Sequence, residues 1–198
     1  MLGSITPLGE RGRGSRWWLT VNAYVLGSAV AGLVTGAVFG WLGSVLGGGL
    51  ETEMRFALLA FVVMLGLALD LGALGLHLPT IHRQVDEDWR TSYRGWIWGL
   101  GYGVQLGIGV VTIVTSSTVY STWFAAFLTA DLRAGAVIGL VFGLARSLPV
   151  FAVARVRRPD QLLRVDGILG RLAAPARKAA LAGGAALAAL SLAGAARW

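Results

Sequence analysis

An uncharged run over residues 95–130 constrains the fold of this chain more than any other feature. A straight helix crosses the hydrocarbon core of a bilayer in about 20 residues, and this run is nearly twice as long. We therefore expect it to bend, to break or to form two short spans. It also carries a glycine at every fourth position, a spacing that places small residues on one helix face and lets another helix approach closely. These glycines are Gly95, Gly99, Gly103 and Gly107.

The composition indicates an all-α, polytopic helical bundle in a membrane. Of the 198 residues, 56% are hydrophobic and 14% are charged, whereas soluble domains hold about 25% charged residues. The net charge is +7, but the basic residues gather in segments 11–16, 83–94 and 155–178, each beside an apolar run. That pattern is typical of cytoplasmic loops under the positive-inside rule. It predicts a lipid bilayer as the surrounding medium and argues against nucleic-acid binding.

The spans follow from these alternations of charge and hydropathy. We predict a cytoplasmic tail over residues 1–16 and one transmembrane domain over residues 17–198, with spans at 19–47, 56–78, 95–130, 134–154 and 179–196. If residues 95–130 formed two spans, the two most basic loops, 79–94 and 155–178, would lie on opposite sides. A single broken span places all basic segments on one side. We therefore expect five spans rather than six in the cell (plasma or inner) membrane, with a cytoplasmic N-terminus and an external C-terminus.

The break in the third span is expected at residues 105–109 or 115–118, where glycine and polar residues interrupt the apolar pattern. Irregular backbone at membrane depth needs cover from protein or a water-filled cavity. Two further glycine series with the same four-residue spacing, in the first and fourth spans, predict close helix packing of the glycine-zipper kind. They are Gly32, Gly36 and Gly40, and Gly135, Gly139 and Gly143.

Asp70 and Arg146 are the charged residues that fall well inside the predicted spans. Charges at that depth face the bundle interior and find a partner. Counted from the outer ends of their helices they lie roughly 21 Å and roughly 18 Å deep, so we predict that they form a pair. Gln105 enters from the inner side to roughly 15 Å.

Other polar groups near the break can line a path across the membrane. They are Thr112, Thr115, Ser116, Ser117 and Thr118. Pro149 cannot donate a hydrogen bond to the carbonyl of Ala145, so we expect a helix break and a free acceptor beside Arg146. Two interpretations stay open: a transport pathway, and a structural lock in which the hydroxyls bond their own backbone.

The chain contains no cysteine, which excludes disulfides, thiol relays and thiolate metal sites for these residues. His77 and His82 are five residues apart and have no third ligand nearby, so we predict no metal and no other cofactor. Nucleotide-binding and hydrolase motifs are absent from the sequence, and we expect no enzymatic activity.

Two sequence stretches carry a resemblance to a known family. GLGYGVQLGIGVVTIVTSS, followed by RAGAVIGLVFGLARSLPVFAVA, resembles the fourth and fifth helices of the transmembrane domain of DsbD and of its short relative CcdA, in the cytochrome c biogenesis, LysE-like superfamily. The resemblance covers roughly residues 30–195 and implies the family's scaffold and topology. The family's first helix and its redox cysteines have no counterpart here, so its thiol chemistry is not implied.

The resemblance also implies a function, because the superfamily includes exporters of amino acids and metal ions. We therefore expect a small-solute or ion transporter or exporter, assembled as a homo-oligomer or with a membrane partner protein. The alternative is a non-transporting membrane subunit or scaffold of a larger complex.

Overall fold

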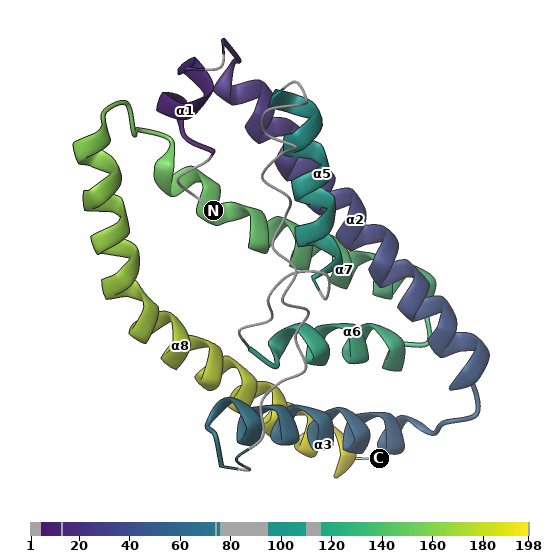
Figure 1. Ribbon diagram of the computed structural model, residues 1–198. Coiled ribbons are helices and arrows are strands. Elements are labelled where there is room, and N and C mark those ends of the chain that lie inside the picture. The colour runs from purple at the N-terminus through teal and green to yellow at the C-terminus, as the bar shows by residue number, and fades with distance from the viewer. Residues whose placement is uncertain (1–4, 13, 74, 76–94, 110–115, 198) are drawn as a thin grey trace.

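The computed structural model contains helices and no strand in the residues it describes, which are 5–12, 14–73, 75, 95–109 and 116–197 (Figure 1). The predicted helical bundle is confirmed. Four helices in this part of the chain are long and apolar enough to cross a membrane. The elements are α1 (Pro7–Gly12), α2 (Trp17–Leu46), α3 (Thr52–Asp70), α5 (Gly95–Ile108), α6 (Thr118–Leu128), α7 (Leu132–Ser147), the 3-10 helix η2 (Leu148–Val153) and α8 (Pro159–Ala195).

Helix α2 packs against α5, α6 and α7, and its contact with α7 is formed by the two glycine series. Gly36 lies against Gly135 and Gly139, while Gly32 lies against Gly139 and Gly143, so the two helices run antiparallel. A Cβ atom on Gly36 would be 2.9 Å from the nitrogen of Gly139, inside van der Waals contact with backbone. Ser28 adds a buried hydrogen bond by donating its Oγ to the carbonyl of Gly143 over 2.8 Å.

Helix α5 packs along another part of α2 through its own glycine series. Gly99 lies against Thr20 and Gly103 against Tyr24, so this pair of helices runs parallel. A Cβ on Gly99 would be 2.6 Å from the carbonyl oxygen of Thr20. Each of the three glycine series thus faces the backbone of a neighbouring helix.

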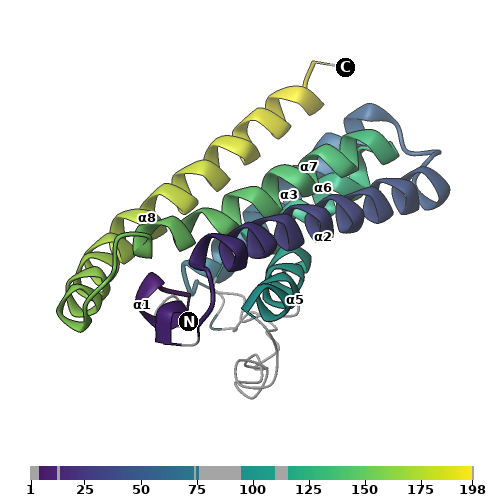
Figure 2. The ribbon, with the colours of Figure 1, turned by 90° about the horizontal axis from the view of Figure 1, so that it is seen from above.

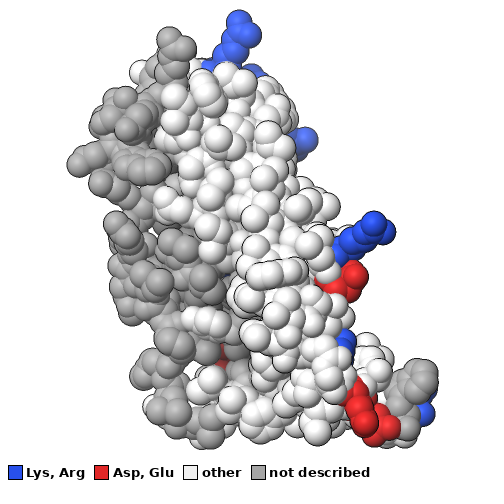
Figure 3. All heavy atoms as spheres, turned by 90° about the vertical axis from the view of Figure 1, so that its right-hand side faces the viewer, with Lys and Arg blue, Asp and Glu red and all other residues white. Residues whose placement is uncertain are grey.

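The outward face of α2 carries large apolar side chains such as Leu26, which is 60% exposed, and Val45, which is 61% exposed. Figure 3 shows this side of the molecule as a broad uncharged surface with most of its charged side chains along the margins. Such a surface matches a lipid environment.

The third span is broken, as predicted. Helix α5 ends at Ile108, and Gly109 follows with a φ of 82°, in the left-handed region that favours glycine. Helix α6 then begins at Thr118. The helix therefore stops within the first predicted break region, 105–109, and resumes at the end of the second, 115–118.

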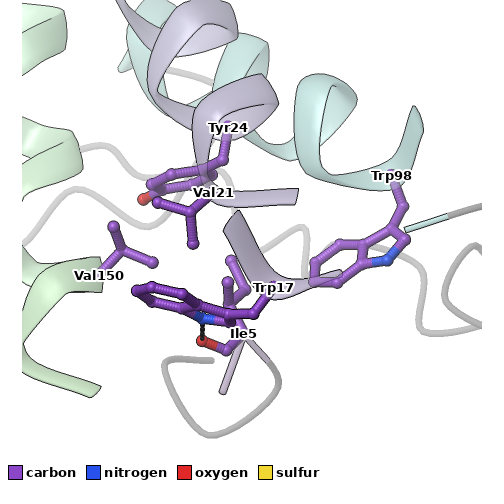
Figure 4. Packing of buried hydrophobic residues seen from close by; sticks show 6 residues of the cluster. All are labelled: Ile5, Trp17, Val21, Tyr24, Trp98 and Val150. Atoms are coloured by element: carbon purple, nitrogen blue, oxygen red, sulfur yellow. Dashed lines mark hydrogen bonds between the residues drawn. The ribbon is translucent and has the colours of Figure 1, made fainter. Parts of the chain in front are cut away.

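The N-terminal segment differs from the predicted tail, because its described residues pack against the bundle. The indole nitrogen of Trp17 donates to the carbonyl of Ile5 over 3.0 Å, and both side chains are buried with Val21 and Val150 (Figure 4). The fully buried Glu10 accepts a hydrogen bond from the hydroxyl of Thr20 over 2.9 Å. Burial of these apolar side chains and this hydrogen bond hold the described residues of the predicted tail against the bundle.

Two predicted boundaries are also corrected. The second span was predicted over residues 56–78, but α3 runs over Thr52–Asp70 and ends in turns at residues 71–73. The basic segment 155–178 was predicted as a loop, yet α8 is a continuous helix of 37 residues from Pro159. Proline suits the first turn of a helix, and the Leu, Ala and Arg residues that follow have high helix propensity, so the charges lie on a helix.

Candidate functional site

The break between α5 and α6 holds a carboxylate. Asp70, the last residue of α3, accepts hydrogen bonds from the backbone nitrogen of Ser117, at 2.9 Å to Oδ1 and 3.1 Å to Oδ2. The hydroxyls of Ser117 and Ser116 donate to Oδ2 over 2.8 Å and 2.9 Å. The hydroxyl of Ser116 also lies 2.8 Å from that of Thr118. We call Asp70, Ser116, Ser117 and Thr118 the Asp70 site.

This arrangement provides a hydrogen-bond acceptor for the backbone at the start of α6. The first backbone N–H groups of a helix have no partner within it, and the hydroxyl of Ser117, at the N-cap of α6, bonds Asp70 rather than the backbone of its own helix. Asp70 supplies a cap from a different helix, and its negative charge suits the positive end of the α6 dipole. Gly66 provides the room, because a Cβ there would be 2.7 Å from the hydroxyl of Ser117.

Helix α8 joins the site from the other side. A guanidinium nitrogen of Arg177 donates to the backbone carbonyl of Asp70 over 2.8 Å. That carbonyl lies in the last turn of α3, where such groups lack partners within the helix. A cation is favourable at a helix C-terminus. Asp70 and Arg177 thus link three helices, α3, α6 and α8.

The predicted pair between Asp70 and Arg146 is not formed among the described residues: Asp70 forms hydrogen bonds with the start of α6 and with Arg177. Arg146 lies in the last turn of α7, with its guanidinium carbon 5.4 Å from the ring centroid of Phe142. That distance is within the range of a cation–π contact. The two charged side chains therefore have different neighbours.

The carbonyl of Ala145 is not the free acceptor that Pro149 predicted. The α-helical pattern ends at Ser147, the backbone nitrogen of Leu148 donates to Ala145, and Pro149 sits in the first turn of the 3-10 helix η2. A 3-10 turn needs no donor from the proline, so the carbonyl keeps a partner.

The remaining predicted polar residues are only partly brought together. Gln105 is half-buried on α5, and its backbone carbonyl accepts a hydrogen bond from the backbone nitrogen of Gly109 over 3.3 Å. Thr112 and Thr115 lie outside the described residues. Of the predicted hydroxyl cluster, Ser116 and Ser117 reach Asp70, and Thr118 reaches Ser116. Within the described residues no cluster of three or more His, Asp or Glu suited to a metal occurs.

An aromatic pocket between α2, α3 and α6 was not predicted. It has a volume of about 500 Å³ and is formed by α2, α3 and α6, with a lining of Phe39, Val62, Tyr120, Trp123, Phe124 and Phe127. The indole nitrogen of Trp123 donates to the carbonyl of Ile108 over 3.1 Å, which ties α6 to the end of α5. Aromatic residues spaced along residues 120–127 are the signal that a helical projection would have revealed.

Arg55 is a second feature that the sequence reasoning missed. It donates to the carbonyls of Gly47 at 3.2 Å and of Leu128 and Thr129, each at 3.4 Å. These carbonyls lie at the C-terminal ends of α2 and α6, where they lack partners within the helix. A single arginine thus joins two helix ends to the first turn of α3.

These features define an integral membrane protein built from a helical bundle with one discontinuous span. Residues 2–158 match the family described as the cytochrome C biogenesis protein transmembrane region, and the chain belongs to that family. The resemblance drawn from the glycine-rich helices is therefore confirmed.

Three proteins that are similar in sequence to this chain share the name MauF. The chain is 32% identical over 195 residues to the methylamine utilization protein MauF of Paracoccus versutus, covering 96% of this chain and 69% of that protein. It is 32% identical over 191 residues to MauF of Paracoccus denitrificans, covering 94% and 67%. A third MauF, from Methylobacillus flagellatus, is 30% identical over 105 residues, covering 53% and 37%. No solved structure matches the chain.

Proposed function

We propose that this chain is a membrane component of a methylamine utilization system and that it moves a small solute past the break in its third span. The first part rests on the two Paracoccus relatives, whose name refers to methylamine utilization and which match 96% and 94% of the chain. Thiol–disulfide exchange is not part of the proposal, because the chain has no cysteine.

The observation that carries the transport proposal is the Asp70 site. Discontinuous helices whose ends meet inside the membrane form the solute sites of many transporters. Here the start of α6 meets a half-buried carboxylate that accepts hydrogen bonds from the hydroxyls of Ser116 and Ser117. A small ammonium ion or another cation can compete with these hydroxyls for the carboxylate. Methylammonium is the first solute to test.

The orientation proposed from the basic segments places the N-terminus in the cytoplasm and the C-terminus outside the cell membrane. A bundle of five spans has little room to enclose a complete path. We therefore propose that the working unit is a homo-oligomer or a complex with a membrane partner.

Transport is tested with purified protein in vesicles loaded with buffer and supplied with radiolabelled methylammonium. The protein should accelerate entry, and Asp70→Asn should remove at least nine-tenths of that rate. Glu53→Gln is the matched control, because Glu53 is an exposed carboxylate at the start of the same helix. Entry no faster than in empty vesicles, or a D70N protein as active as E53Q, would refute transport of this solute through the site.

A second candidate is the non-transporting scaffold, and the completeness of the cap on α6 favours it. The carboxylate of Asp70 already accepts three hydrogen-bonding groups, as a structural lock would.

Cysteine labelling can distinguish the two candidate functions, because an introduced cysteine is the one thiol in a chain that has none of its own. Single cysteines at Gln105, Ser116 and Ser147 are treated with a membrane-impermeant thiol reagent from each side of the vesicle. Reaction at Ser116 supports a water-filled path. Complete protection of all three in folded protein supports the scaffold and directs the search to a partner.

A further inference from the structure

Helix α8 is too long to lie entirely within a bilayer as an upright span. Its 37 residues extend about 55 Å at about 1.5 Å per residue, whereas the hydrocarbon core is about 30 Å thick. About half of the helix must therefore lie at or beyond the membrane surface.

The second half of α8 is the part that packs as a span. A Cβ on Gly194 would be 3.1 Å from the ring of Phe56, and one on Gly184 would be 2.9 Å from the side chain of Leu67. These contacts follow α3 in the antiparallel direction as far as Arg177, which bonds the last residue of α3. Helix α3 ends there, so the part of α8 before Arg177 has no span of α3 beside it.

The first half of α8 stands apart from the bundle. In Figure 1 it runs across the direction of α3, and in Figure 2 it lies at the edge of the molecule and is seen nearly along its axis. Pro175 lies inside the helix, and proline is a common cause of kinks. The two halves therefore point in different directions.

The first half of α8 is amphipathic, with a basic stripe and an apolar face. Arg164, Arg171 and Lys178 are seven residues apart and share one exposed stripe. The helix also has an apolar face, which includes Leu172, 53% exposed. The other members of this apolar face are Leu162, Val165, Leu169 and Ala176. A helix with one cationic and one apolar face lies in the plane of a membrane interface.

We propose that residues 159–178 form an interfacial helix that binds anionic phospholipids. Its apolar face enters the boundary between headgroups and acyl chains, and Arg164, Arg171 and Lys178 contact the headgroup phosphates. Arg155, Arg157 and Arg158, just before the helix, add positive charge at the same end. An anionic lipid surface fits this charge, because basic residues are attracted to its negative potential. The proposal does not depend on the solute that the protein moves.

The test uses single cysteines at positions 162 to 176, each carrying a nitroxide label, in the full-length protein in vesicles. Contact with a water-soluble relaxation agent is compared in vesicles with and without phosphatidylglycerol. We expect contact to oscillate with a period of about 3.6 residues. In anionic vesicles we expect at least fivefold less contact at Leu169 and Leu172 than on the basic stripe.

Neutralising the stripe with Arg164→Gln, Arg171→Gln and Lys178→Gln should abolish most of that difference in anionic vesicles. The control removes the same charge elsewhere, with glutamine at the exposed Arg11, Arg133 and Arg197, and should keep the oscillation. Arg177 is left unchanged because it bonds α3. Uniform water contact on all faces, uniform protection on all faces, or an oscillation unaffected by the triple change would overturn the proposal.

Discussion

Replacing Gly36 by alanine should destabilise the bundle, because its methyl group has no space to occupy. The new Cβ would overlap the carbonyl oxygen of Gly135 and lie 2.9 Å from the backbone of Gly139. No side-chain rotation relieves an overlap with backbone, so α2 and α7 must move apart. Overpacking of this kind costs about 1–3 kcal/mol, equivalent to a fall in melting temperature of about 2–12 °C for a chain of this size.

The matched control is Gly183→Ala in α8, where no atom lies within 4 Å of the new Cβ. There the same substitution should stabilise the protein by about 0.5–1 kcal/mol, because alanine favours the helix over glycine. Both variants and the parent are melted in one detergent and followed by circular dichroism. A Gly36→Ala protein that melts with or above the Gly183→Ala protein would refute the packing argument.

Three further substitutions test single contacts. Arg55→Gln removes the charge shared by two helix ends, and hydrogen–deuterium exchange there should accelerate about tenfold, since a charged hydrogen bond contributes about 1.5–3 kcal/mol. Asp131→Ala removes the 2.6 Å bond that caps α7 and should lower stability by about 1 kcal/mol, measured by denaturant melts; unchanged stability would contradict the cap. Trp123→Phe keeps an aromatic side chain, although a smaller one, and loses the indole bond to Ile108; it should cost at least about 1 kcal/mol in the same melts.

The glycine spacing predicted which helix faces are packed but not which helices meet. Gly36 and Gly139 belong to series with the same period, and that period says only that each series lies on one face. Their meeting in antiparallel register depends on the α2–α3 and α6–α7 turns, which set the direction of each helix. The sequence therefore indicated the kind of contact, and the fold determined its partner.

The predicted Asp70–Arg146 pair shows the limit of reasoning from depth. Depth is one coordinate, and two residues at the same level can lie on helices that do not adjoin. In addition, α3 begins at Thr52 rather than at residue 56 and ends at Asp70, so the carboxylate sits at a helix end. The signal that did point to its partner was the hydroxyl pair Ser116 and Ser117, placed just before an apolar helical run, as at many helix starts.

The break and the carboxylate are therefore one feature rather than two. A helix that starts inside a membrane domain leaves N–H groups that neither lipid nor its own preceding turn can bond. Asp70 supplies the missing acceptor for the start of α6 at Ser117. Any solute that draws the carboxylate away from Ser117 must also uncap α6, so binding and the position of α6 are thermodynamically linked. The same linkage would operate in a non-transporting scaffold, because a partner protein that moves α3 would also move Asp70 and alter the hydrogen bonds at the start of α6.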